Sequence, residues 1–164
     1  MTAREIAMSE YQYFEFQTID RPLTSEQMQQ ISSYSTRATI TKHSFVNEYH
    51  WGDFKGNPSE WMRLYFDAFL YHANWGTHQL KLKLVEDVVD FNQIEAYCRS
   101  DCLTVEKHDD EIILSFYLES EPEGWEEDWQ LSTFLPLRTQ ISRGDYRTLY
   151  IGWLLSVQQK EYEE

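Results

Sequence analysis

Alternating polar and apolar residues predict strands in several parts of the chain. Residues 11–19 alternate in this way, with Phe14 and Phe16 on one side and tyrosine or polar side chains on the other. A period of two residues is typical of a strand that is buried on one face only. Residues 79–84 show the same pattern, with three leucines facing the core and two lysines facing solvent. Residues 38–50, rich in β-branched and aromatic side chains, predict a further strand.

Capping residues mark two helix starts in the first half of the chain. Thr24 is followed by Gln27 three residues later, a capping box in which each side chain bonds the backbone of the other residue. Asn57 before Pro58 combines a cap with a first-turn proline. From there a helix is predicted over 58–73, with apolar side chains around most of its circumference. Such a helix belongs in the centre of a domain.

The second half of the chain begins with a short helix near 90–98. Two strands follow, 103–108 and 111–118, which an Asp-Asp turn joins into a hairpin. Residues 119–128 contain six acids, one proline and one glycine, a composition that predicts an acidic loop.

Two helices are predicted near the C-terminus. One holds Pro136 in its first turn and ends at Gly144, and the other is capped by Asp145. The order β-α-β-α-β-α-β-β-α-α predicts an α+β fold, a mixed sheet of about five strands covered by helices. The length fits one domain over 1–164, with residues 1–9 disordered and 160–164 forming a charged tail.

The net charge of the chain argues against one class of binding partner. The chain carries 14 Lys and Arg against 28 Asp and Glu, a net charge of −14. Nucleic-acid binding relies on basic residues that neutralise phosphates, so this balance argues against a nucleic-acid ligand. Acidity favours solubility and attraction to a basic protein partner.

The cysteines and the hydropathy indicate the compartment. Cys98 and Cys102 are too few for a disulfide framework and form at most half of a zinc site. No segment approaches the roughly 18 consecutive apolar residues of a membrane span, and the first residues do not form a signal peptide. These features predict a cytoplasmic protein that does not contact a membrane.

Two glycine-containing loops are rich in aromatic side chains. The Trp51 loop spans residues 49–56 and the Trp75 loop spans 74–78. If both loops lie at one end of the sheet, their rings form an exposed patch of the kind that marks a protein interface. The alternative is that both tryptophans fill the core. The candidate binding residues are Tyr49, Trp51, Phe54, Lys55 and Trp75.

A second pattern concerns catalysis. His50 and Asp53 have the residue types of an oriented acid–base pair, and His72 or His78 could assist them. The same four residues could also converge as ligands of a metal ion. The pattern lacks a nucleophile and any motif of defined spacing, and the chain contains no phosphate-binding glycine loop. No catalytic residue, metal site or cofactor is assigned on this basis.

Several blocks resemble a widespread family of uncharacterised bacterial proteins. The longest are 44–56 (SFVNEYHWGDFKG), 66–77 (FDAFLYHANWGT) and 144–154 (GDYRTLYIGWL). The resemblance covers roughly 10–157 and implies a bacterial, cytoplasmic setting, with this chain as the N-terminal domain of a longer protein. It implies no catalytic or binding residues.

Three functions follow from these observations. The first is a non-enzymatic interaction or regulatory module that uses the two aromatic loops. Its partner can be another protein or a second copy of the chain in a homo-oligomer. The second is an enzyme based on His50 and Asp53. The third is an acidic mimic of nucleic acid, which requires carboxylates arrayed along one surface.

Overall fold

The structure is a computed structural model that describes residues 10–85, 87, 89–119 and 129–162, with side chains described up to Leu154. The predictions made for residues 1–9, for most of the acidic loop and for the last two residues of the tail lie outside the described residues.

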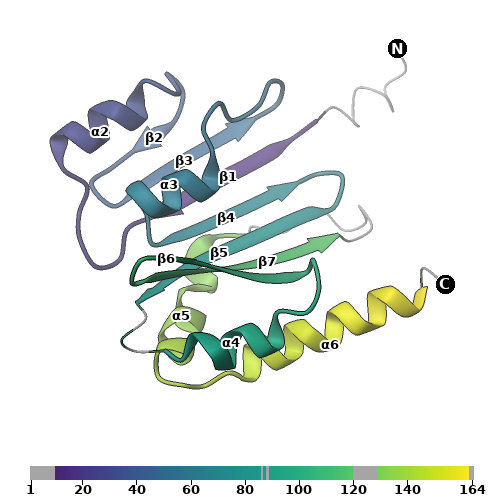
Figure 1. Ribbon diagram of the computed structural model, residues 1–164. Coiled ribbons are helices and arrows are strands. Elements are labelled where there is room, and N and C mark those ends of the chain that lie inside the picture. The colour runs from purple at the N-terminus through teal and green to yellow at the C-terminus, as the bar shows by residue number, and fades with distance from the viewer. Residues whose placement is uncertain (1–9, 86, 88, 120–128, 163–164) are drawn as a thin grey trace, which may run out of the picture.

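One antiparallel sheet of seven strands organises the described part of the chain, in the order β2-β3-β1-β4-β5-β7-β6 (Figure 1). The strands are β1 (Gln12–Gln17), β2 (Thr39–Ile40), β3 (Ser44–Tyr49), β4 (Ala68–Ala73), β5 (Thr77–Val85), β6 (Leu103–His108) and β7 (Glu111–Glu119). The helices are α2 (Ser25–Ser32), α3 (Pro58–Leu64), α4 (Phe91–Tyr97), α5 (Leu135–Ser142) and α6 (Arg147–Tyr162), with a 3-10 helix η2 (Leu131–Thr133).

The prediction of a mixed sheet of about five strands is wrong. The fold is α+β, but its seven strands pair in antiparallel fashion throughout. One additional strand arises where the predicted strand over 38–50 breaks into the β2–β3 hairpin. The other is β4, which replaces the second half of the helix predicted over 58–73.

The position of β4 explains the error over 58–73. Helix α3 does begin at the predicted cap, where Asn57 accepts a hydrogen bond from the backbone of Glu60, but it ends at Leu64. In β4, Phe69 packs into one hydrophobic core and Leu70 into another, because the strand lies in the middle of the sheet. A strand buried on both faces is as uniformly apolar as a buried helix, and periodicity alone does not separate the two.

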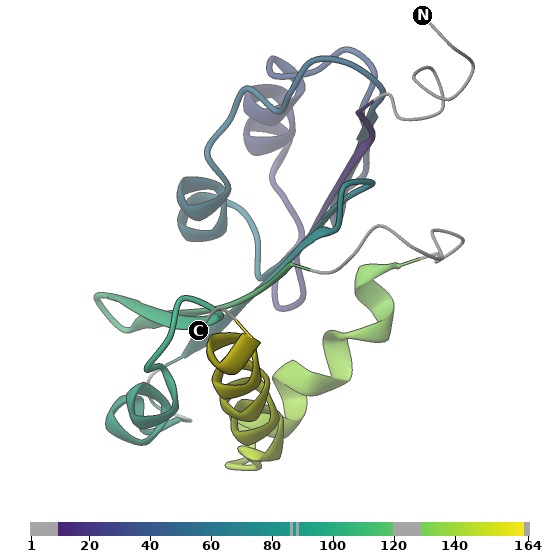
Figure 2. The same cartoon turned by 90° about the vertical axis from the view of Figure 1, so that its right-hand side faces the viewer.

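Two hydrophobic cores lie on opposite faces of the twisted sheet. In the edge view of Figure 2, α2 and α3 lie on one side and α4, α5 and α6 on the other. The first side holds the aromatic core, with Phe14, Phe16 and Trp61. The second side holds the aliphatic core, which includes Leu82 and Leu114. Alternate residues of one strand therefore supply both cores.

The predicted hairpin and the capping box are present in the structure. Strands β6 and β7 pair around a turn in which Asp109 adopts a φ of 55°. Thr24 and Gln27 exchange hydrogen bonds at the start of α2, at 3.1 and 3.0 Å. These features depend on neighbouring residues only, which is why the sequence predicts them well.

The lysines of β5 do not face solvent as predicted. The side chain of Lys81 is buried, and its Nζ donates a hydrogen bond to Ser115 Oγ at 2.9 Å. This burial lowers the pKa of Lys81, against an opposing effect of the Glu106 carboxylate. Lys83 is largely buried and lies 3.6 Å from an Asp67 carboxylate oxygen. Side chains of neighbouring segments, Ser115, Asp67 and Glu111, thus lie against the second face of β5, and the periodicity of a single strand does not report its neighbours.

Replacing Phe16 with alanine is expected to destabilise the fold severely. The Phe16 ring is fully buried and packs on Phe69 at 4.4 Å and on Trp61 at 5.1 Å between ring centroids. We expect Phe16→Ala to lower the free energy of unfolding by about 3–5 kcal/mol, measured by urea denaturation. The exposed Ile151 provides a control, since Ile151→Ala is expected to change it by less than about 0.5 kcal/mol. A loss below about 1 kcal/mol for Phe16→Ala would contradict the assigned core.

Candidate functional site

The Trp51 and Trp75 loops lie at the same end of the sheet, on either side of β1. Gln12 pairs with Tyr49 of β3 on one side and with Ala73 of β4 on the other. Its amide Nε2 donates a hydrogen bond to the carbonyl oxygen of Gly52 at 3.2 Å. The start of β1 therefore holds the Trp51 loop directly.

The Trp75 loop is tied to the same strand. The backbone N–H of Tyr11 donates to Asn74 Oδ1 at 3.1 Å, and the Asn74 N–H donates to the carbonyl of Tyr11 at 3.0 Å. Both loops are thus anchored to β1, which fixes their relative position.

Phe54 anchors the Trp51 loop in the aromatic core. Its ring lies 5.1 Å from that of Phe14 and 4.7 Å from that of Trp61, between centroids. Gly56 allows this packing, because an added Cβ would lie 2.6 Å from the Phe54 ring and 2.9 Å from Trp61 Nε1. The candidate binding residue Phe54 is half-buried and packs beneath the loop against the aromatic core.

Trp51 is left on the outside of the anchored loop. Its side chain is 78% exposed, the largest exposure among the large hydrophobic residues of the described chain. It lines a cleft of about 580 Å³ with Tyr34, Tyr49 and Lys55. The Trp51 cleft is bounded by residues 33–37 between α2 and β2, by the end of β3 and by the Trp51 loop.

Hydrogen bonds shape the wall of the Trp51 cleft that lies opposite the loop. Ser35 Oγ accepts from the backbone N–H groups of Arg37 and Ala38, each at 3.2 Å, and from Asn47 Nδ2 at 2.9 Å. Asn47 is buried in β3, so it ties the 33–37 segment to the sheet. The cleft is therefore formed before any ligand arrives.

The Trp51 cleft is less acidic than the whole chain. Its lining includes Arg37 and Lys55 as cations, with Glu48 and Asp53 as carboxylates. These formal charges cancel, whereas the chain carries a net charge of −14. The cleft thus offers aromatic faces with paired opposite charges.

Trp75 does not line the Trp51 cleft. Its side chain is 43% exposed, and its indole Nε1 donates to Thr77 Oγ1 at 2.9 Å. Thr77 in turn donates to the Glu119 carboxylate at 2.9 Å, and the Tyr117 hydroxyl bonds the same carboxylate. This network holds the Trp75 indole against the β5–β7 pair, so the two tryptophans occupy separate surfaces at one end of the sheet.

Each of the four acid–base candidates, His50, Asp53, His72 and His78, contacts a different neighbour in the structure. Asp53 Oδ1 accepts a hydrogen bond from the backbone of Phe54 at 2.7 Å, and no hydrogen bond joins Asp53 to His50 in the described part of the chain. His72 and His78 face each other across β4 and β5 with ring centroids 6.4 Å apart. No group of three His, Cys, Asp or Glu residues among those described is arranged to hold a metal ion.

The histidines instead belong to a ring stack on the face of the aliphatic core. Tyr11 lies between His50 and His72, at 5.3 and 6.2 Å between centroids. His72 stacks on Tyr13 at 4.8 Å, and His78 stacks on Trp129 at 4.3 Å. The rings thus connect the exposed end of the sheet with residues next to η2.

Burial shifts the proton affinities in the ring stack. It is the main cause that lowers the pKa of His72, and His78 adds to the shift, whereas a backbone hydrogen bond with Trp129 opposes it. Burial also raises the pKa of Tyr11 to about 12, with a smaller effect of Glu48. Glu15 supports the stack, because it accepts from Tyr13 at 3.1 Å and from the backbone of Leu131 at 2.8 Å.

The ring stack was not predicted, although the sequence holds a signal for it. His72 and His78 flank the Asn74-Trp75-Gly76 turn, and a hairpin across this turn places them directly opposite each other. The prediction of a helix over 58–73 concealed this relationship. Burial raises the pKa of the Cys98 thiol to about 11, which disfavours its nucleophilic thiolate form.

Gly56→Ala is expected to loosen the Trp51 loop. The added methyl group clashes with the rings of Phe54 and Trp61, so we expect the free energy of unfolding to fall by about 1–3 kcal/mol in urea denaturation. Gly152→Ala in α6 is the matched control, because its Cβ meets its nearest neighbour at an ordinary 3.5 Å. The control is expected to be neutral or to stabilise by up to about 1 kcal/mol. Equal effects of the two substitutions would contradict the close approach at Gly56.

The buried His72 makes stability depend on pH. Since its pKa is lowered by folding, the native state binds fewer protons than the unfolded chain below about pH 6.5. Stability should therefore fall as the pH drops from about 6.5 through the lowered pKa, by up to about 1.4 kcal/mol per pH unit. His72→Phe should flatten this slope in urea titrations between about pH 5 and pH 7.

Tyr11→Phe serves as the control, because Tyr11 stays protonated over this range and its loss should leave the slope intact. A slope that persists in His72→Phe would assign the proton uptake to other groups.

Comparison with known proteins assigns no family. The chain matches no protein-family model, no curated protein and no solved structure.

Proposed function

We propose that the protein is a non-enzymatic interaction module that binds a segment of a partner protein in the Trp51 cleft. The observation that carries the proposal is the exposure of Trp51, 78%, at the edge of a cleft of about 580 Å³. Tryptophan is the side chain most enriched among residues that dominate binding energy in protein interfaces.

The anchoring of the Trp51 loop favours a binding role over a packing role. Phe54 and Gly56 fix the loop on the aromatic core, so the fold does not need Trp51 for that purpose. A rigid loop also loses little conformational entropy when a partner binds, which increases affinity for a given contact area. The Trp51 indole is therefore a preorganised contact.

The lining of the cleft indicates the chemistry of the bound segment. Trp51 and the nearby Tyr34, also exposed, offer faces for an apolar or aromatic anchor residue. Arg37 and Lys55 beside Glu48 and Asp53 suit a segment of mixed charge. The net charge of −14 attracts a partner that is basic overall and accelerates the encounter.

The setting of this interaction is proposed to be the bacterial cytoplasm, on the resemblance described above and the low cysteine content. The described helices include none that is both long enough and apolar enough to cross a membrane.

Replacing Trp51 with alanine tests the proposal. We expect Trp51→Ala to weaken partner binding by a factor of about 30 or more, because an interface tryptophan of this kind contributes about 2 kcal/mol or more. The partner is first identified by photo-cross-linking in cells that make the protein, with benzoylphenylalanine in place of Lys55. Binding of the purified partner is then measured by titration calorimetry.

Trp75→Ala is the matched control, since Trp75 lies at the same end of the sheet but outside the cleft. It should retain wild-type affinity. The proposal fails if Trp51→Ala binds as tightly as the wild type. It also fails if Trp51→Ala lowers the free energy of unfolding by more than about 2 kcal/mol, which would make Trp51 a core residue.

A further inference from the structure

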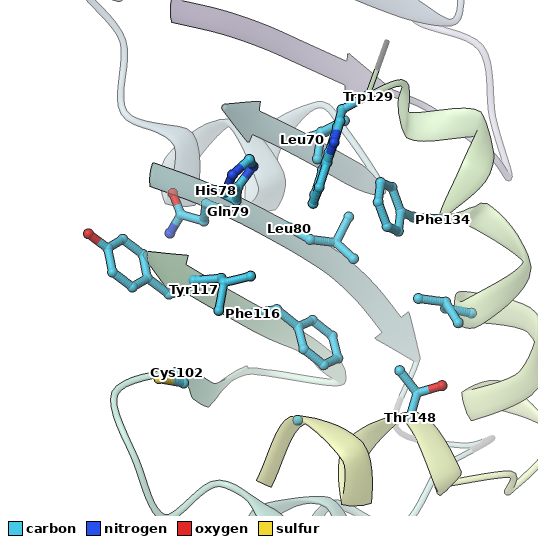
Figure 3. A pocket seen from close by; sticks show the side chains of 13 residues that line it. Leu70, His78, Gln79, Leu80, Cys102, Phe116, Tyr117, Trp129, Phe134 and Thr148 are labelled. Atoms are coloured by element: carbon cyan, nitrogen blue, oxygen red, sulfur yellow. The ribbon is translucent and has the colours of Figure 1, made fainter. Parts of the chain in front are cut away.

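A second cavity lies on the opposite face of the sheet from the aromatic core. It occupies about 230 Å³ between strands β4, β5 and β7 and the helices α5 and α6. Figure 3 shows Trp129 and Phe134 on one side of this inner cavity, with Phe116 and Thr148 on the other. None of its lining residues belongs to the Trp51 cleft.

The lining of the inner cavity is apolar and rich in rings. Leu70, Leu80 and Leu137 contribute aliphatic surface, and Phe116 and Phe134 contribute aromatic surface. Of the described residues that line it, none is an Asp, Glu, Lys or Arg. An ionised ligand would have to leave water without a counter-charge there, which is strongly unfavourable. The inner cavity therefore selects a neutral molecule.

Gly152 keeps the inner cavity open. It lies inside helix α6 and has no positive φ, so its backbone conformation does not require glycine. A Cβ at this position would meet Phe116 at 3.5 Å and Leu103 at 3.6 Å, which are ordinary contacts. Alanine is more favourable than glycine inside a helix. Gly152 therefore makes the helix less stable than an alanine would, and the missing side chain leaves space beside the Phe116 ring.

We propose that the inner cavity binds a small, flat, neutral aromatic molecule of up to two fused rings. An engineered cavity of about 150 Å³ with similar walls binds benzene, so a cavity half as large again accommodates a second ring. The rings of Trp129, Phe116 and Phe134 favour offset or edge contacts with an aromatic ligand. Thr148 lines the same space, and few polar atoms face it, so apolar and ring contacts would hold the ligand.

Fluorine NMR titration of the full chain with 5-fluoroindole tests this proposal. We expect saturable binding with a Kd below about 1 mM. Gly152→Leu places a side chain in the inner cavity and should weaken binding about tenfold or more. Ile151→Leu introduces the same side chain at the neighbouring, exposed position of α6 and should bind like the wild type.

Other variants separate this site from the Trp51 cleft. Trp51→Ala should leave 5-fluoroindole binding unchanged, even where it abolishes binding of the partner protein. If Gly152→Leu does not fold, Thr148→Leu replaces it, since Thr148 lines the same space. Absence of saturable binding to the wild type overturns the proposal, as does equal binding to the wild type and to the cavity-filling variant. Tighter binding of 1-octanol than of 5-fluoroindole overturns the assignment of a flat ring in favour of an acyl chain.

Discussion

The structure depends on one constraint, the burial of β4 on both faces of the sheet. Its alternate side chains supply two cores, with Phe69 in the aromatic core and Leu70 in the aliphatic core. Neither set of helices could cover the sheet alone, because each covers one face of it (Figure 2). β4 also pairs with β1, to which both loops are anchored, and with β5, where the pairing places His72 opposite His78.

This arrangement explains why the two proposed sites lie on different faces. The Trp51 loop extends from β3 and is held by Phe54 in the aromatic core, whereas the inner cavity is bordered by α5 and α6 on the side of the aliphatic core. The ring stack runs along the second face from the end of the sheet to Trp129. His78 takes part in the stack and also lines the inner cavity.

The sequence predicts well those features that neighbouring residues determine. The Thr24 capping box, the Asn57 cap and the hairpin around Asp109 each arise from side chains within a few residues of one another. Prediction from the sequence fails where the burial of a residue depends on distant parts of the chain. β4 is apolar on both faces because helices cover both, and Lys81 is buried because Ser115 of β7 lies beside it, so periodicity misassigns both. Of the candidate site residues, Trp51 faces the cleft, whereas Phe54 packs under the Trp51 loop. The sequence does not separate these two roles, because they depend on which ring reaches the aromatic core.

Two features of the structure make folding less favourable than it could be. Trp51 exposes a large apolar ring to water, and Gly152 weakens a helix without relieving any close contact. Natural sequences tend to depart from locally favourable choices at functional positions, where the departure has a use other than stability. The buried Lys81 is also unfavourable for folding, but it lines neither the Trp51 cleft nor the inner cavity. An unfavourable residue therefore indicates a site only when, as at Trp51 and Gly152, it also borders space that a ligand can occupy.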